Sequence, residues 1–438
     1  MKLGWSDTDR EILRLALPAL GALIAEPLYI LADTAVVGHL GTPQLAGLAL
    51  ASQALLSFHA LMIFLAYGTT AAVSRLLGAG QRREAARNVV QGLWIALGAG
   101  VVGAGLIYVL TDPILELLGG QGEVLENARV YLRVSLPGLP AMLVSLAAVG
   151  YLRGLQDTVR PLIVAVVTAV GNLVLELVLI YGFDLGIGAS ALSTVLAQWA
   201  GAALYLTWVG RDLRRQGVAL LPDLSAMRRQ AVVAGDLFLR TAALRGSFTV
   251  AVAAAARIGE VELAAHEVVF QLWMLIALAL DAVAIAGQAM VGTFLGADDR
   301  HGARRVGARM VQWGLTLGVL VAAILLLLRP VLPHLFSDDA AVISLTAFLM
   351  IHLALMQPVN GVVFALDGIL IGAGDMRFLA WAMIGAAALF VPLALAVPAL
   401  DAGIGWLWGA IWVLMVARAI GLLWRFRSDA WLVTGAAR

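Results

Sequence analysis

Long apolar stretches, separated by short polar connections, recur along the whole chain. Each stretch approaches or exceeds the roughly 20 residues that an α-helix needs to cross the hydrocarbon core of a bilayer. Polar and apolar residues do not alternate as they would in the strands of a membrane barrel, so the pattern predicts helices throughout. We expect twelve membrane-spanning helices, near residues 13–39, 46–77, 86–110, 128–153, 160–182, 187–209, 231–257, 263–295, 304–328, 341–371, 378–399 and 403–424.

The composition supports a polytopic, all-α integral membrane protein. Hydrophobic residues make up 62% of the 438 residues and charged residues 13%, whereas a soluble domain carries about 25% charged residues. The net charge of +1 gives no basic surface of the kind that binds nucleic acid. The chain has no cysteine, and none of its histidines forms an H-x-x-x-H pair. Neither a metal site nor a bound cofactor is therefore expected.

Arginine residues favour one side of the predicted bundle. Most of them lie in the chain tails and in the connections that follow even-numbered helices, for example Arg82, Arg83, Arg214 and Arg215. Cytoplasmic loops of membrane proteins are enriched in arginine and lysine. We therefore expect a multi-pass protein of the cell (inner) membrane with both termini in the cytoplasm.

The second half of the chain repeats the first at an offset of about 218 residues. The offset carries Gly154 to Gly372 and Asp157 to Asp375. Six helices in each half give two repeats with the same orientation, related by an axis along the membrane normal. We expect an N-terminal six-helix lobe at residues 1–210, a cytoplasmic linker at 211–230 and a C-terminal six-helix lobe at 231–438. Two such lobes favour an alternating-access transporter over a receptor or a purely structural bundle.

Two acidic residues interrupt the first apolar stretch, in the segment AEPLYILADTAVVGHLG at residues 25–41. At 1.5 Å per residue, Glu26 lies about 20 Å into the helix and Asp33 about 30 Å, in its outer half. A charge at such depth costs several kcal/mol, and residues that carry one usually have a function. Pro27 removes a backbone hydrogen bond beside Glu26 and is expected to act as a hinge.

The fifth helix carries a third acid at a matching depth. Glu176 lies in its outer half, and Asn172 is one turn away on the same face. We expect Asp33, Asn172 and Glu176 to form one polar cluster in the N-terminal lobe. The 218-residue offset carries Asp33 to Ala251 and Glu176 to Ala394, so the C-terminal lobe lacks this cluster. Burial and a nearby like charge favour the protonated form of a carboxyl group, which suits proton coupling. The alternative is that these acids only position their helices.

Other residues are candidates for the wall of a central cavity or for ion pairs. Arg240 and Asp281 are expected to pair, and Asp367 is expected near the wet cytoplasmic end of its helix. Aromatic, thioether and amide side chains suit the binding of flat apolar compounds. The candidate substrate-binding residues are Tyr29, Gln53, Met62, Arg245, Gln271 and Met274.

Five motifs, in chain order, resemble those of the multidrug and toxic compound extrusion (MATE) transporters, in particular the branch of DNA-damage-inducible protein F. They are ADTAVVGHLG, LAGLALASQ, LRGLQDTVRP, GNLVLELVLIYG and LIGAGDMRF. The resemblance implies a twelve-helix exporter driven by inward flow of H⁺ or Na⁺. It also implies that Asp33 is the coupling residue, assisted by Asn172 and by Glu176, where relatives more often have aspartate. Arg240 and Asn360 stand where the sodium-type branch has acids, so the resemblance favours H⁺.

We therefore expect a cation-coupled, H⁺-driven multidrug efflux antiporter that exports amphiphilic, often cationic compounds and works as a monomer. Glu26 joins the expected cation-coupling residues. Na⁺ coupling and a flippase for lipid-linked precursors are the alternatives. An enzyme would need nucleophiles or metal ligands converging at one depth, and the sequence offers none. A nucleotide-binding G-x-x-x-x-G-K-[ST] motif is also missing, so ATP is not the expected energy source.

Overall fold

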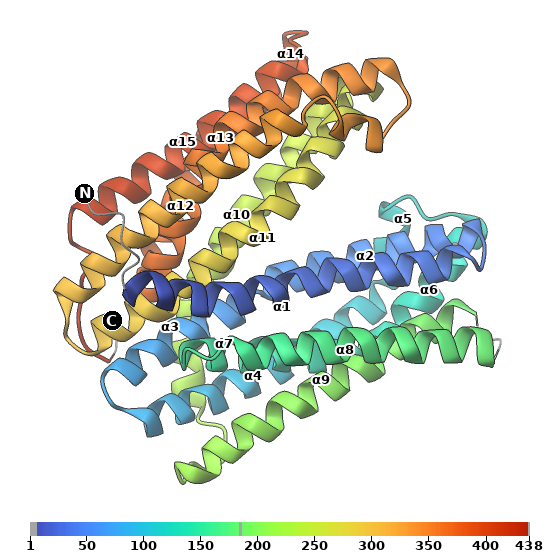
Figure 1. Cartoon of the computed structure of the whole chain (residues 1–438). Helices are drawn as coiled ribbons and strands as arrows, with labels where there is room; N and C mark the ends of the chain where they lie inside the picture. The colour runs from blue at the N-terminus through green and yellow to red at the C-terminus, as the bar shows by residue number, and fades with distance from the viewer. Residues whose placement is uncertain (1–6, 184–185, 437–438) are drawn as a thin grey trace. The chain divides into compact units, whose positions relative to one another are not determined.

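The computed structural model describes residues 7–183 and 186–436, and this part of the chain is helical, without strands. It contains twelve helices or joined helices that are long and apolar enough to cross a membrane (Figure 1). The expected all-α fold with twelve spans is confirmed, with ends that differ from the expected ones by several residues. The spans are Asp7–Gly38 (α1), Thr42–Gly78 (α2 and α3), Arg82–Val109 (α4), Gly122–Gly154 (α6, η1 and α7), Val159–Gly182 (α8 and η2), Ile187–Arg215 (α9), Leu224–Ile258 (α10), Glu260–Gly296 (α11), Arg300–Leu328 (α12), Ala340–Gly372 (α13), Met376–Ala399 (α14) and Ile404–Arg427 (α15).

Two shorter helices lie between spans, α5 (Thr111–Leu117) and η3 (Leu332–Leu335). Three of the spans are interrupted. Ile63 separates α2 from α3, the short η1 (Leu136–Gly138) precedes α7, and α8 ends in the π-helical η2 (Val178–Gly182). Irregular backbone within a span is tolerated where protein buries it, and π-helical turns often occur at functional sites.

The chain forms two compact units. The N-terminal unit is Leu17–Ala234, and the C-terminal unit combines the chain up to Ala16 with the chain from Gly235 onward. Both α1 and α10 therefore contribute to both units. The predicted linker at 211–230 overlaps two helix ends, and only residues 216–223 lie between α9 and α10. Side chains of α4 hold this connection, since Trp94 donates a hydrogen bond to the carbonyl oxygen of Leu220 at 2.9 Å and Gln91 donates to that of Leu221 at 3.3 Å.

The core of the N-terminal unit consists of apolar side chains from its helices. One cluster joins α1, α2, α4, α5, α6, η1, α7 and α9 and includes Leu48, Leu115 and Leu132. Another joins α3, α4, α7, α8 and α9 around Tyr151 and Leu152. In the same unit, α8 packs against α9.

In the C-terminal unit, α13 is the central helix and contacts α11, α12 and α15. The first turns of α1 also belong to this unit. Asp9 is 1% exposed and accepts hydrogen bonds from Arg309 Nε at 2.6 Å, Arg309 Nη2 at 2.9 Å and Trp313 Nε1 at 2.8 Å. We call this group the Asp9 clasp. It fixes the beginning of α1 to α12.

Close backbone approaches between helices recur in the two units at the same 218-residue offset. At five of the six glycines, a Cβ atom would collide with the backbone of the facing helix, and at Gly154 it would collide with the Val73 side chain and lie 3.0 Å from the carbonyl oxygen of Thr70. Such contacts between small residues let membrane helices pack tightly. The pairs are Gly100 with Pro140 and Gly318 with Pro358, Gly150 with Ala66 and Gly368 with Ala284, and Gly154 with Thr70 and Gly372 with Gln288. The repeat seen in the sequence therefore extends to the packing of the helices.

Candidate ion-coupling and substrate site

Asp33 lies on the buried face of α1, one turn before Val36 and Val37. Its side chain accepts a hydrogen bond from Ser190 Oγ of α9 at 2.5 Å and one from the hydroxyl of Tyr131 of α6 at 3.3 Å. The residue is 4% exposed. The carboxylate is thus held from two other helices, by hydrogen bonds from two uncharged hydroxyl groups.

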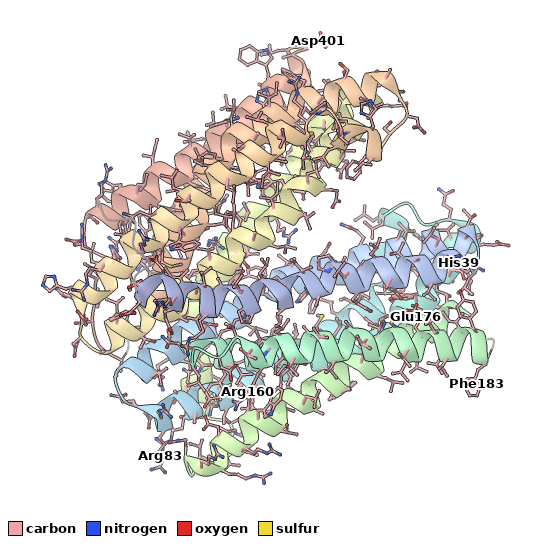
Figure 2. The ribbon with its side chains drawn as sticks, in the orientation of Figure 1. His39, Arg83, Arg160, Glu176, Phe183 and Asp401 are labelled. Carbon is pink, nitrogen blue, oxygen red and sulfur yellow. The ribbon has the colours of Figure 1, made fainter. Side chains whose placement is uncertain are left out.

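Glu176 of α8 faces both the Asp33 carboxyl group and the Ser190 hydroxyl. It is fully buried, yet neither of its oxygens makes a hydrogen bond of good geometry with any described residue. In Figure 2, Glu176 lies toward the Phe183 end of its helix, far from Arg160 at the other end. Two carboxylates that meet in a low-dielectric interior repel each other, and a shared proton or a bound cation relieves this repulsion. The structure thus brings Asp33 and Glu176 together, and Asn172 lies one helical turn from Glu176.

Asn172 is also buried, at 1% exposure, and both polar atoms of its amide lack a partner among the described residues. Buried polar groups are usually hydrogen-bonded, so an unpartnered amide beside two carboxyl groups indicates room for a ligand, a water molecule or a changed rotamer. Directly after Glu176, α8 continues as the π-helical η2.

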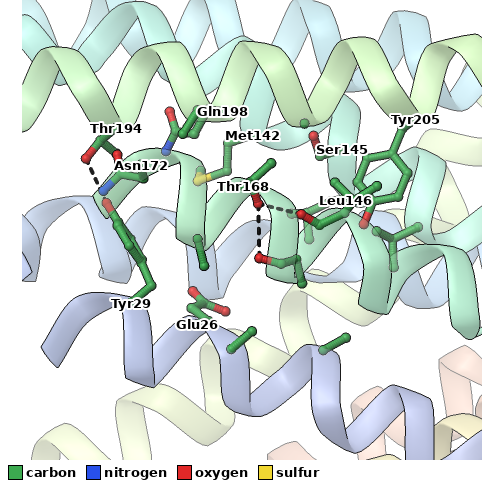
Figure 3. A pocket seen from close by; sticks show the side chains of 18 of the residues that line it. Glu26, Tyr29, Met142, Ser145, Leu146, Thr168, Asn172, Thr194, Gln198 and Tyr205 are labelled. Atoms are coloured by element: carbon green, nitrogen blue, oxygen red, sulfur yellow. Dashed lines mark hydrogen bonds between the residues drawn. The ribbon is translucent and has the colours of Figure 1, made fainter. Parts of the chain in front are cut away.

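A cavity of about 270 Å³ opens in the N-terminal unit between α1, α2, α7, α8 and α9. Figure 3 shows Glu26 and Tyr29 entering it from α1, with Asn172, Thr194 and Gln198 on the opposite wall. The hydroxyl groups of Tyr29 and Thr194 share a hydrogen bond of 2.7 Å. Three of the predicted site residues, Glu26, Tyr29 and Asn172, therefore line one cavity.

Asp33 and Glu176 do not line this cavity but lie just beyond it. Tyr29 on α1 and Asn172 on α8 each stand one turn closer to the cavity than the acid on the same helix. Thr194 lines the cavity and donates to the carbonyl oxygen of Ser190 at 3.1 Å, while the Ser190 hydroxyl binds Asp33. One turn of α9 therefore connects the carboxyl pair with the cavity wall.

Glu26 has a partner that the sequence analysis did not select. Its Oε1 atom lies 3.3 Å from Nδ1 of His59 on α2, and its side chain is 49% exposed. Both residues line the cavity. The sequence places Glu26 and His59 at similar depths in two successive, antiparallel helices. It does not reveal that the faces of the helices that carry them meet.

The other predicted substrate-binding residues do not line this cavity. In the N-terminal unit, Gln53 is exposed and Met62 half-buried on α2. In the C-terminal unit, Arg245 and Gln271 are exposed and Met274 is half-buried. Their role in substrate binding stays a prediction.

The predicted hinge residue, Pro27, lies inside α1. A second proline, Pro18, lies in the same helix, close to the boundary between the two units at Ala16 and Leu17. The hinge function of Pro27 stays a prediction.

The expectation that Asp367 is wet is wrong. It is 7% exposed and accepts from Arg240 Nη2 of α10 at 2.5 Å and from Arg418 Nη2 of α15 at 2.7 Å. The hydropathy pattern could not show that three helices cover this carboxylate, and Arg418 was missed altogether. Asn360, on the same helix as Asp367, is fully buried. A contact between Arg240 and Asp281 stays a prediction.

Comparison with known proteins identifies the family. Residues 18–178 and residues 237–396 each match the MatE family model. The chain belongs to the MATE family. It is 31% identical over 97% of its length to DNA damage-inducible protein F of Escherichia coli, covering 94% of that protein. It is also 30% identical over 98% of its length to Protein DETOXIFICATION 44, chloroplastic, of Arabidopsis thaliana, covering 84% of that protein.

Solved structures share the fold of this MATE protein. A crystal structure of a MATE transporter in the bent conformation superposes with a TM-score of 0.89 at 22% identity, covering 97% of this chain and 96% of the other. A MOP superfamily transporter from Pyrococcus furiosus gives a TM-score of 0.86 at 23% identity, covering 97% of each chain. The predicted family is thus confirmed, and the chain is a multi-pass membrane transporter of small molecules, not an enzyme.

Proposed function

We propose that this MATE protein is an H⁺-coupled antiporter that exports amphiphilic, often cationic compounds by alternating access, with Asp33 as the coupling carboxylate. The observation that carries the proposal is the buried pair of Asp33 and Glu176 beside a cavity that itself contains a carboxylate. Relatives support the cargo class, since a protein of Chromobacterium violaceum that is 27% identical over 80% of this chain is described as a probable multidrug resistance protein. The protein works as a monomer in the cell membrane, with both termini in the cytoplasm.

The proposed cycle exchanges one proton for one cargo molecule. A proton from outside binds the carboxyl pair, which removes one negative charge and weakens the attraction of the unit for a cationic cargo, so the cargo leaves. Release of that proton to the cytoplasm restores the charge and attracts the next cation. Asn172 assists by hydrogen bonding to the carboxyl pair in both its protonated and its deprotonated state. Pro27 lets α1 change its shape as the charge of the pair changes.

Na⁺ is the second candidate for the coupling ion. Carboxylate and amide oxygens are ligands that hard cations accept, and both oxygens of Glu176 together with Oδ1 of Asn172 have no partner among the described residues. A flippase for lipid-linked precursors is disfavoured because the described residues that line the cavity include a glutamate but neither lysine nor arginine, and an anionic phosphate would meet no compensating charge there.

The test is accumulation of the fluorescent cation acriflavine in inside-out vesicles, with pH and Na⁺ gradients imposed separately. Wild-type protein should concentrate the dye when only the pH gradient is present. Asp33→Asn should lower this uphill transport at least about tenfold, because the exchanged proton loses its site, whereas the protein should still reach the membrane. Glu176→Gln should weaken the response to pH by a smaller factor.

Asp112→Asn is the matched control. Asp112 pairs with Arg129 at 2.7 Å on the surface of the same unit, outside the cavity, so its variant should transport like wild type. Uphill export at the wild-type rate by Asp33→Asn would refute the coupling role. Dye accumulation that follows the Na⁺ gradient and ignores a protonophore would instead identify Na⁺ as the driving ion.

A further inference from the structure

The cavity of the N-terminal unit has an unequal distribution of charge along its walls. Of the described residues that line it, one is a carboxylate, Glu26, and one is a histidine, His59, while lysine and arginine are missing. The remaining polar groups are hydroxyls and amides of neutral residues. The formal charge of the cavity wall therefore depends on these two side chains alone.

The two side chains lie close enough that protonation of His59 changes the net charge of the pair. His59 Nδ1 lies 3.3 Å from Glu26 Oε1. While the imidazole is neutral, the carboxylate presents a full negative charge to the cavity. Once the imidazole is protonated, the two groups form an ion pair and the cavity wall becomes formally neutral. Histidine is the side chain that commonly changes charge between pH 5 and 8.

We propose that the Glu26–His59 end of the cavity is the subsite that binds the positively charged nitrogen of the cargo, and that protonation of His59 weakens this subsite. The inference rests on the proposed export of organic cations and names where their charge binds. A cation that enters the cavity pairs with the Glu26 carboxylate, which the His59 imidazolium would otherwise neutralise. Proton and cargo thus oppose each other here, at a location separate from Asp33 and Glu176.

The rest of the cavity favours the apolar part of such a cargo. Met142, Leu146 and Val149 of α7 line one wall. Tyr29 and Tyr205 contribute aromatic rings, and an aromatic face within about 6 Å attracts an organic cation further. The walls therefore suit a compact, flat amine or quaternary ammonium compound more than an anion or a sugar.

Among the described residues that line the cavity, no other side chain accounts for a change of charge near neutral pH. Besides the pair, the described lining residues of α1 and α9 that can titrate are Tyr29 and Tyr205, and tyrosine ordinarily titrates near pH 10. The described lining residues of α7 and α8 have no ionisable side chain. Asp33 and Glu176 lie behind Tyr29 and Asn172, outside the cavity lining.

The experiment measures equilibrium binding of acriflavine, a flat and permanently charged dye, to the purified full-length protein in detergent between about pH 5.5 and pH 8. Wild-type Kd should rise about tenfold toward the acidic end, which corresponds to roughly 1.4 kcal/mol. Measured in the Asp33→Asn background, which removes the contribution of the carboxyl pair, His59→Asn should hold Kd near its pH 8 value across the range. Glu26→Gln should bind the dye about tenfold more weakly than wild type at pH 8, because the carboxylate that attracts the cation is gone.

His39→Asn provides the matched control, since His39 lies on the surface at the end of α1, bonded to the carbonyl oxygen of Ala35 at 2.7 Å, and does not line the cavity. It should titrate like wild type. The inference is overturned if adding His59→Asn to Asp33→Asn leaves the pH profile unchanged, or if Glu26→Gln binds the dye at pH 8 as tightly as wild type. The Glu26 variant decides the matter if the His59 variant does not fold. Asp33→Asn separates the two proposals. It should lose uphill export but keep the pH-dependent Kd, so failure of one proposal leaves the other standing.

Discussion

Asp367 is a single buried carboxylate that binds two guanidinium groups, those of Arg240 and Arg418. Removing one partner of a buried ion pair leaves an uncompensated charge and costs about 3–5 kcal/mol. We therefore expect Asp367→Asn to lower the apparent melting temperature of the purified protein strongly, because two arginines lose their anion. Thermal unfolding followed by tryptophan fluorescence in detergent measures this effect.

Asp157→Asn is the control for this prediction, since Asp157 also pairs with an arginine but does so at the surface. Its partner, Arg160, is 49% exposed and lies 3.3 Å away. A surface pair of this kind contributes about 0–1 kcal/mol, so the melting temperature should barely change. If both substitutions lower the melting temperature equally, the buried ion pairs of Asp367 contribute no more to stability than a surface pair does.

At this scale, the sequence revealed the residues whose chemistry is out of place in a membrane span. Asp33, Glu176 and Glu26 stood out because carboxylates are rare in apolar helices. His59 and Arg418 did not, because their importance depends on which helix faces meet, and neither hydropathy nor spacing contains that information. A buried carboxylate near a helix end, such as Asp367, looks identical in sequence to a wet one.

Helix packing in the C-terminal unit depends on glycines at the crossing of α12 and α13. A Cβ atom at Gly361 would collide with the carbonyl oxygen of Gly314, and one at Gly314 would collide with that of Gly361. We expect Gly361→Ala to force these helices apart and to lower the yield of folded protein, since backbone on both sides prevents relaxation. Fluorescence-detected size-exclusion chromatography of detergent extracts measures the folded fraction.

Gly385→Ala is a suitable comparison because it lies in a neighbouring helix, α14, with no atom within 4 Å of the added Cβ. Alanine there should leave the yield unchanged or raise it, as it favours the helix over glycine by about 1 kcal/mol. A normal elution profile for Gly361→Ala would mean that the crossing adapts easily.

Whole helices were predicted well because each spans about 30 Å of hydrocarbon and must be apolar over that length. Interruptions within helices were not. The π-helical η2 after Glu176 and the break at Ile63 leave the hydropathy unchanged, so the pattern gives no sign of them. The turn η1 does contain Pro137, a residue that lacks the backbone donor that a continuous helix uses.

Across the whole molecule, the helix packing is repeated in the two units, whereas the buried charged residues differ between them. The same glycine contacts occur in both units, so one packing plan serves both. The carboxyl pair has no counterpart, because Ala251 and Ala394 occupy the equivalent places and are 1% and 0% exposed. The second unit thus uses those positions for plain core packing, and its Asp367 is paired with Arg240 and Arg418 instead of with a second carboxyl group. The repeat was visible in the sequence, but the different buried charge groups of the two units could be recognised only from the side-chain contacts.

The helix that carries Asp33 belongs to both units, and the Asp9 clasp fixes its first turns to α12. If α1 transmits the state of the carboxyl pair, its fixed end must stay in place while the cycle proceeds. We expect Asp9→Ala to reduce acriflavine export several-fold, because Arg309 and Trp313 lose their common acceptor, at about 1–3 kcal/mol. The Kd for acriflavine at about pH 8 should not change, since the cavity lies wholly within Leu17–Ala234. Asp7→Ala, two residues earlier at an exposed position of the same helix, should affect neither quantity. Export at the wild-type rate from Asp9→Ala would mean that α1 works without an anchored beginning, and a parallel loss of binding would indicate general unfolding instead of a broken connection.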